Sequence, residues 1–328
     1  MRPFFRHSLF ILIFVVTTGC TRAADRETDL ESMHPSSSQA ATTTERGGYT
    51  LAQDITYKPV HRRDTGQMEL QKLDIYYKEG WSKRPVVVFI HGGGWVRGDK
   101  SNVQRNPDLW QAFLRQGMVL ASVNFRLPRD MSGRGVTYRD QVADIAAAIK
   151  WLTENVEEFG GDPDRLFLLG YSSGAHLAAL IGLNERLLAK QGLPVSTVKG
   201  VIAMDVHAYD VPQAIREMQS TFLRSRIPMM KNFFGFTSRD QMEASPIHYV
   251  DEPGSVPFLI ISAGQKEGAA QLVSKAVSER FHQRLQEGGH SSAHVHFSGH
   301  THSALVMGFG KDSDAVAPAV LKFLNKLQ

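Results

Sequence analysis

The sequence contains a single cysteine, Cys20, in 328 residues. A lone cysteine excludes a core held together by internal disulfides. The 37 basic and 33 acidic residues leave a formal net charge of +4, yet the basic residues form no long run and no stripe with interleaved aromatic side chains. This pattern argues against nucleic acid as a partner. The chain also lacks an apolar run long enough to cross a membrane as a helix.

The N-terminus has the pattern of an export signal over residues 1–19. Two arginines precede a short apolar run at residues 9–16, and small residues follow it. Residues 17–20 read Thr-Thr-Gly-Cys, which resembles a bacterial lipobox, although Thr17 stands where leucine is usual. The pattern predicts an exported lipoprotein in which Cys20 carries the membrane anchor, at the periplasmic face or the cell surface. Ordinary cleavage near Ala24 would instead release a periplasmic or secreted protein.

Residues 20–48 are rich in serine, threonine, alanine and charge, and they have almost no large apolar side chains. Such a segment cannot bury enough surface to offset the entropy of ordering, so it is predicted to be a disordered tether before a folded domain at 49–328. Within that domain, short β-rich runs alternate with helical stretches, which predicts a mostly parallel sheet with helices on both faces. The expected strands lie at 70–77 (an edge strand), 85–90, 118–125, 165–169, 198–204, 257–262 and 294–297, and the expected helices at 138–159, 173–190, 269–286 and 315–327.

A nucleophile elbow is the strongest motif in the chain. The segment Gly170-Tyr171-Ser172-Ser173-Gly174 stands between an apolar run and a stretch rich in small residues, which is the strand–turn–helix setting of the pattern G-x-S-x-G. The two glycines lack a Cβ, so the strand and the helix can approach closely. Ser172 is therefore predicted to be the nucleophile, and Ser173 to contribute its backbone amide.

About 80 residues upstream, His91-Gly92-Gly93-Gly94-Trp95 follows a continuously apolar run and matches the oxyanion loop of esterases and lipases. The amides of Gly93 and Gly94, together with that of Ser173, are predicted to form the oxyanion hole. Trp95 and Tyr171 are the expected contacts with substrate. A phosphate-binding loop is the alternative for three consecutive glycines, but no lysine or hydroxyl residue completes one here. Together the loop and the elbow point to acyl transfer to water.

The general base is expected after the last strand, where five histidines lie between residues 290 and 302. His302 is the preferred candidate because it follows that strand and precedes the last helix, and His300 is the second choice. Neighbouring histidines in a strand can also clamp a metal ion, but the serine machinery accounts for one histidine without any metal.

The acid that orients the base is expected in the loop after the strand at 257–262. Glu267 is the only carboxylate in that loop, and a glutamate can orient a histidine as an aspartate does. Asp205, at the end of the strand at 198–204, is the alternative. Glu267 is the predicted acid. The alternative explanation for a glutamate at this position is that it lies in the first turn of the following helix, where the helix dipole stabilises a negative charge.

From about Leu70 onward the chain resembles the α/β-hydrolase superfamily, in particular hormone-sensitive-lipase-like esterases and kynurenine-formamidase-like enzymes of the BD-FAE type. The resemblance rests on the elbow, the oxyanion loop, Asn124-Phe125-Arg126-Leu127 and Gly161-Asp162-Pro163-Asp164-Arg165. It implies an α/β-hydrolase fold with an eight-stranded, mostly parallel sheet, and hydrolysis of carboxylic esters without a cofactor. The chain departs from the family in lacking an aspartate in the acid loop and in having Ser173 where alanine is commoner.

Residues 206–248 form an insertion rich in methionine and phenylalanine, a candidate lid that offers pliant apolar contacts to an acyl chain. The alternative is that these side chains pack between helices as part of the ordinary hydrophobic core. The predicted function is a serine carboxylesterase for small-molecule esters with short acyl chains or aryl groups. An aryl formamidase or amidase, and a non-catalytic binding lipoprotein on the same scaffold, are the alternatives, since a fold does not fix a function.

Overall fold

The computed structural model describes residues 41–58, 70–252, 256–264 and 270–328. The predicted export signal, Cys20 and Glu267 lie outside these residues. Within them, no helix is long and apolar enough to cross a membrane.

The described residues form a nine-stranded sheet, in the order β1-β2-β3-β5-β4-β6-β7-β8-β9. The strands are β1 (Thr42–Arg46), β2 (Tyr49–Thr56), β3 (Lys72–Tyr77), β4 (Arg84–Ile90), β5 (Val119–Val123), β6 (Gly161–Tyr171), β7 (Val198–Met204), β8 (Phe258–Ala263) and β9 (Ser292–Phe297). The first three strands and the β3–β5 pair are antiparallel, and all pairs from β5 to β9 are parallel. The prediction of a mostly parallel sheet is therefore confirmed.

Three details of the sequence prediction are wrong, and all concern the antiparallel end of the sheet. The sheet has nine strands in place of eight. The ordered fold begins by residue 42, inside the predicted tether, because β1 pairs with β2 over its whole length. The strand predicted at the edge, β3, is an inner strand between β2 and β5. The strand β1 is short and polar, so it has no alternation of apolar residues from which a strand could be predicted. Its pairing with β2 is seen only in the three-dimensional structure.

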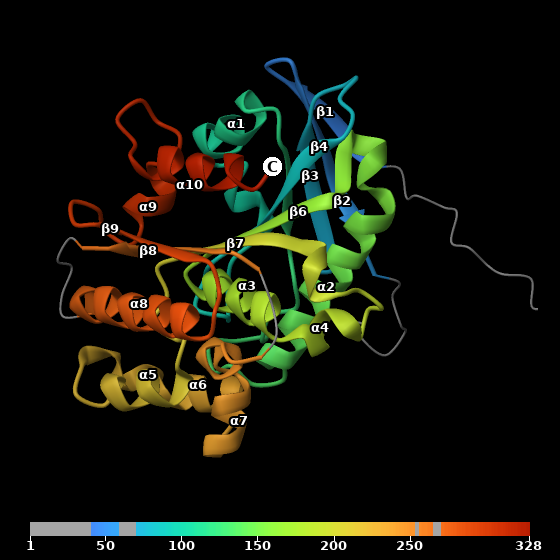
Figure 1. Ribbon diagram of the computed structural model, residues 1–328. Coiled ribbons are helices and arrows are strands. Elements are labelled where there is room, and N and C mark those ends of the chain that lie inside the picture. Colours follow the sequence, from blue (N-terminus) through green and yellow to red (C-terminus); the bar gives the residue numbers. More distant parts are fainter. Residues whose placement is uncertain (1–40, 59–69, 253–255, 265–269) are drawn as a thin grey trace, which may run out of the picture. The chain divides into compact units, whose positions relative to one another are not determined.

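Helices cover both faces of the sheet (Figure 1). One face carries α1 (Pro107–Arg115), α9 (Ala304–Met307) and α10 (Val316–Asn325), and the other carries α2 (Tyr138–Asn155), α3 (Ser173–Leu183), α4 (Glu185–Ala189) and α8 (Ala270–Glu287). Each face has its own buried apolar cluster, and continuous apolar strands such as β4 contribute alternate side chains to the two clusters. The helix predicted at 173–190 is divided at Asn184, whose side chain accepts a hydrogen bond from the Arg186 amide and caps α4.

The insertion at 206–248 is helical. It contains α5 (Val211–Met218), the short 3-10 turn η5 (Phe222–Arg226), α6 (Ile227–Phe234) and α7 (Ser238–Glu243), which lie together beyond α3 and α8 in Figure 1. Phe233 and Phe234 are fully buried and pack with the ring of Trp95, whereas Phe236 is 71% exposed. The insertion therefore supplies part of the core as well as the wall of a cavity described below.

Parallel strands bring chemically important segments to one edge of the sheet. The glycine loop follows β4, the elbow follows β6, Asp205 follows β7, and the segment containing His302 follows β9. In open sheets of this kind, ligands bind outside the carboxyl ends of the strands. Residues that are far apart in the sequence therefore meet at this edge.

Candidate active site

Ser172 occupies the sharp turn between β6 and α3. Its backbone has φ 54° and ψ −123°, a conformation that L-residues rarely adopt. A Cβ on Gly170 would lie 2.3 Å from the carbonyl oxygen of Gly174, and a Cβ on Gly174 would lie 2.1 Å from that of Ile90. Both glycines are thus required for the close packing of strand, helix and β4, which confirms the elbow predicted from the sequence.

His302 links the serine to a carboxylate. The Ser172 hydroxyl lies 3.0 Å from Nε2 of His302, and Nδ1 of His302 lies 2.6 Å from Oδ2 of Asp205. In this arrangement Nδ1–H donates to the carboxylate, which leaves Nε2 to accept the serine proton. The structure thus brings Ser172 and His302 together as predicted. His300, the second choice, has its ring against Phe297 instead.

The acid beside His302 is Asp205, so the sequence-based preference for Glu267 is corrected here. Asp205 directly follows β7, one strand earlier in the chain than the loop where the acid was expected. Glu267 lies outside the described residues, but the carboxylate position at His302 Nδ1 is filled by Asp205. In the sequence, Asp205 is marked only by its position at the end of an apolar strand. That feature alone makes it the second candidate for the acid.

The carboxylate of Asp205 is 1% exposed and fully engaged. Its Oδ1 accepts hydrogen bonds from the Ala263 amide, at 3.0 Å, and from the Ser274 hydroxyl. Burial acts to raise the pKa of Asp205, but the hydrogen bonds and the charge of His302 outweigh burial and hold the pKa below its usual value. Asp205 is consequently a fixed anion that orients the imidazole and stabilises its protonated form.

Tyr171 has a different contact from the one predicted. Its ring stacks on His302 with 4.9 Å between ring centroids, and its hydroxyl donates to the His302 carbonyl oxygen at 3.0 Å. It is not among the residues that line the cavity beside Ser172. The structure therefore assigns Tyr171 to holding the histidine segment in place of the predicted contact with substrate.

The glycine loop turns its backbone toward Ser172. Gly93, Gly94 and Trp95 all have positive φ, at 134°, 63° and 64°. Among the described residues, no hydrogen-bond acceptor faces the amides of Gly93 or Gly94, and Ser173 is the first residue of α3, where an amide has no partner inside its own helix. These three groups are the predicted oxyanion donors, and Gly94 and Ser173 line the cavity beside Ser172.

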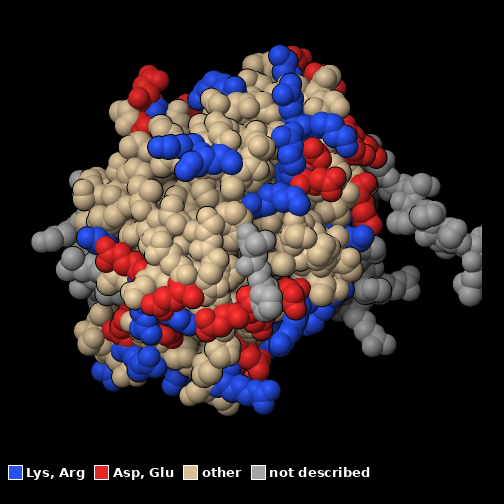
Figure 2. Space-filling view, viewed as in Figure 1, with Lys and Arg blue, Asp and Glu red and all other residues tan. Residues whose placement is uncertain are grey.

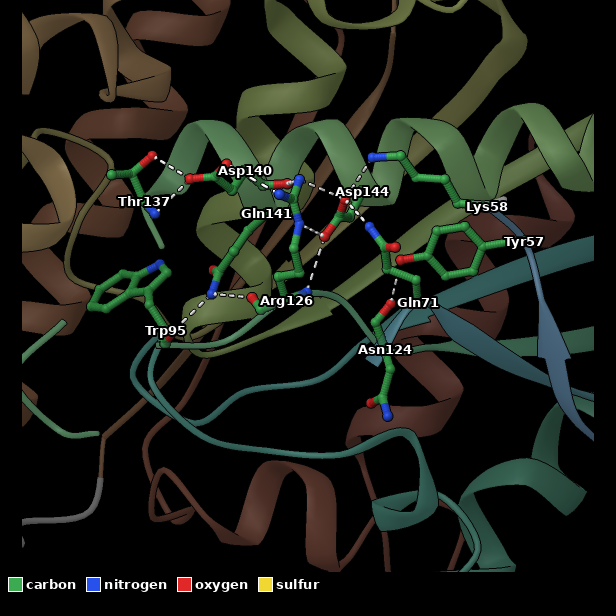
Figure 3. Close-up of polar contacts among 10 residues, drawn as sticks. All are labelled: Tyr57, Lys58, Gln71, Trp95, Asn124, Arg126, Thr137, Asp140, Gln141 and Asp144. Carbon is green, nitrogen blue, oxygen red and sulfur yellow. Dashed lines mark hydrogen bonds and ion pairs between the residues drawn. The ribbon is translucent and has the colours of Figure 1, made fainter. Parts of the chain in front are cut away.

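A side chain that the sequence analysis missed holds this loop. The amide nitrogen of Gln141, in α2, donates to the backbone oxygens of Trp95 at 2.7 Å and Arg126 at 3.0 Å (Figure 3). Arg126 is itself held by the fully buried carboxylate of Asp144, at 2.7 Å from Nε. Gln141 and Asp144 lie one helical turn apart, so α2 fixes both the strained Trp95 and the loop after β5. Only spatial proximity reveals this role, because no local motif surrounds Gln141.

The cavity beside Ser172 has a volume of about 250 Å³. One part of its lining is formed by the catalytic triad (Ser172, His302 and Asp205) together with Gly94, Trp95 and Ser173. Trp95 therefore lies where the predicted contact with substrate requires it. The remaining lining residues are Val206, His207, Ala208, Met218, Leu223, Arg226, Met229 and Met230. The insertion at 206–248 thus contributes most of the apolar surface around the serine.

The other histidines near the C-terminus lie away from Ser172. His294 and His296 both face the hydroxyl of Ser262, at 2.8 and 3.0 Å. In the described part of the chain, no group of three histidine, cysteine, aspartate or glutamate side chains is arranged to hold a metal ion. The hydrogen-bond partner that His294 and His296 share is therefore the hydroxyl group of Ser262.

His176, in α3 directly behind the elbow, predicts a dependence of stability on pH. Its fully buried ring donates from Nε2 to the Ala244 carbonyl at 2.7 Å, and burial lowers its pKa to about 4. The unfolded chain, with a histidine pKa of about 6.5, binds a proton at higher pH than the folded chain. The free energy of unfolding should therefore fall as pH decreases from about 6.5 to 4, by up to about 3 kcal/mol.

His176→Gln is the matched variant, because glutamine keeps a donor for Ala244 and does not titrate. Urea unfolding at a series of pH values should show a flatter profile for His176→Gln than for the wild type across this interval. Parallel profiles for the two proteins would contradict the assignment.

The chain is similar to esterases of known sequence and structure. The model of the BD-FAE family matches residues 73–285. The chain is 29% identical over 280 residues to the esterase LipQ of Mycobacterium tuberculosis, an alignment that spans 83% of this chain and 61% of LipQ. Among solved structures, esterase B of Lactobacillus rhamnosis superimposes with a TM-score of 0.67 at 21% identity, covering 86% of this chain and 88% of that one. The apo form of Thermogutta terrifontis esterase 2 gives 0.61 at 22% identity, covering 89% and 97%.

The structural neighbours share with this chain the parallel sheet and flanking helices of the α/β-hydrolase fold, as the sequence predicted. The family model covers well over half of the chain, including the glycine loop, the elbow and Asp205. The chain therefore belongs to the BD-FAE family of α/β hydrolases.

Proposed function

We propose that this protein is a serine carboxylesterase that works through an acyl-enzyme. The observation that carries the proposal is the continuous chain of contacts from Asp205 through His302 to Ser172 at the edge of a cavity. The names of similar proteins, such as esterase LipQ, support the same activity. The complete triad argues against a non-catalytic binding protein, whose main support was the absence of a convincing acid.

The geometry supplies each step of the reaction. Ser172 Oγ attacks the ester carbonyl carbon while Nε2 of His302 takes the hydroxyl proton, and the negative charge moves to the carbonyl oxygen. The amides of Gly93, Gly94 and Ser173 stabilise that charge, and losing one such donor typically costs about 10²–10³ in kcat. His302 then protonates the leaving alkoxide. Water attacks the acyl-enzyme by the same route, and releases the acid while the proton returns to Ser172.

The size and lining of the cavity favour small substrates. A space of about 250 Å³ with walls of methionine, leucine, valine and tryptophan suits short acyl chains or an aryl group. Aryl formamides are the alternative substrates, since the same triad cleaves amides. We further propose that the protein is exported and held on a membrane by lipid at Cys20, which rests on the sequence pattern alone.

The function is tested with a panel of p-nitrophenyl esters of increasing acyl length and matched aryl formamides. The expected result is hydrolysis that is fastest for short acyl chains, with an initial burst of p-nitrophenol from acyl-enzyme formation. A fluorophosphonate probe should add one adduct, located on Ser172 by peptide mass spectrometry. Absence of both hydrolysis and labelling would overturn the proposal, and faster cleavage of formamides than of every ester would favour the amidase.

Lipidation is tested separately, on protein made in a bacterial host with its complete N-terminus. Mass spectrometry of the N-terminal peptide should show Cys20 as the first residue, carrying acyl chains. Two or more chains would give stable membrane attachment. A mature chain that begins near Ala24 would contradict the anchor.

A further inference from the structure

Among the described residues that line the cavity, Arg226 is the only one with a permanently positive side chain. It ends η5 in the insertion, and its side chain is exposed. One of its guanidinium nitrogens lies 3.6 Å from the point where a Cβ on Gly94 would stand. The cation therefore lies beside the loop that is proposed to bind the scissile carbonyl oxygen.

Within the described residues, the guanidinium of Arg226 has no carboxylate and no hydrogen-bond acceptor of its own. Arg139, by comparison, lies 2.8 Å from Glu243. The acid that lines the same cavity, Asp205, is already bound by His302, Ser274 and Ala263. Among the described residues, no acid of the cavity is thus left to neutralise Arg226.

A second polar group in the cavity also lacks a partner. The ring of His207 lines the cavity, and its buried Nδ1 has no hydrogen-bond partner among the described residues. Burial lowers the pKa of His207, so the ring is neutral and does not compete with Arg226 for an anion.

The face of the molecule shown in Figure 2 has no broad field of one charge sign. On the face shown in Figure 2, basic and acidic side chains are interspersed. In the cavity, Arg226 lies among side chains that are mainly apolar. A guanidinium can bind a carboxylate with two parallel hydrogen bonds, because its planar fork matches the two oxygens.

We propose that Arg226 is a specificity-determining residue and that the preferred substrates are small esters that carry a free carboxylate. This inference rests on the proposed esterase function and narrows it. Because the guanidinium lies beside Gly94, one of the predicted oxyanion donors, the carboxylate would be joined to the scissile ester by a short carbon chain. It belongs either to the acyl group or to the alcohol, and the experiment separates the two.

The test compares kcat/KM for matched pairs of esters that differ in one carboxylate. For the acyl side the pair is monoethyl glutarate and ethyl pentanoate, followed by pH-stat. For the alcohol side it is 4-carboxyphenyl acetate and phenyl acetate, followed by absorbance. The wild type should favour the carboxylate ester in at least one pair by about tenfold or more. Arg226→Gln should lower that ratio by roughly ten- to hundredfold, mainly through KM, and Arg226→Lys should restore part of it.

Arg224→Gln is the matched control, because Arg224 is an exposed arginine of the same turn that does not line the cavity. It should keep the wild-type ratio. The inference is overturned if the wild type favours the neutral ester in both pairs, or if Arg226→Gln leaves the ratio unchanged. Hydrolysis of neutral esters without a preference for the carboxylate would refute this inference alone, whereas no hydrolysis of any ester would refute the proposed function as well.

Discussion

Ser172→Ala should abolish ester hydrolysis, with a loss of roughly 10⁶ in kcat if the triad acts as a unit as it does in serine proteases. The reason is chemical, since alanine removes the only oxygen that faces Nε2 of His302 in the described structure. The measurement is steady-state hydrolysis of p-nitrophenyl acetate together with labelling by a fluorophosphonate. Circular dichroism and urea unfolding should show that the fold is retained.

Ser173→Ala is the matched control for the neighbouring hydroxyl. Ser173 contributes its backbone amide to the site, and alanine keeps that amide at the start of α3. The variant should therefore still be labelled by the fluorophosphonate. Full labelling of Ser172→Ala combined with loss of labelling in Ser173→Ala would move the nucleophile by one residue and refute the elbow as described.

The sequence predicts the elbow and the glycine loop because both depend on local backbone geometry. Gly170 and Gly174 are needed because a Cβ at either position would overlap main-chain atoms. This requirement falls within one short segment of the sequence, where a motif can be recognised. The same holds for the parallel strands, whose burial on both faces produces continuous apolar runs such as β4. Features of this kind can be predicted without knowing which distant segments meet.

The acid and Gln141 could not be predicted with the same certainty, because their roles depend on contacts between distant segments. Asp205 and His302 are 97 residues apart, and Gln141 lies 46 residues from Trp95. Any carboxylate at the end of a neighbouring strand meets the same local criteria. The sequence therefore limits the acid to a few strand ends, and the three-dimensional arrangement of β7, β8 and β9 selects among them.

Asp205→Asn should lower kcat by up to about 10⁴. The amide of asparagine cannot stabilise the imidazolium that forms when Ser172 attacks, and it can pair with either tautomer of His302. In the neutral tautomer with the proton on Nε2, the imidazole no longer accepts the serine proton. The measurement is kcat for p-nitrophenyl acetate at a pH where the wild type is fully active, with KM expected to change much less than kcat.

Glu267→Gln is the variant that separates the two candidate acids. It removes one carboxylate charge from the chain, as Asp205→Asn does, and so serves as the control for a general effect of charge. Because His302 Nδ1 already has Asp205 at 2.6 Å, Glu267→Gln should keep most of the wild-type kcat. A large loss in Glu267→Gln with little loss in Asp205→Asn would mean that the contact between Asp205 and His302 is structural. In that case the working acid would lie after β8, where the sequence first suggested it.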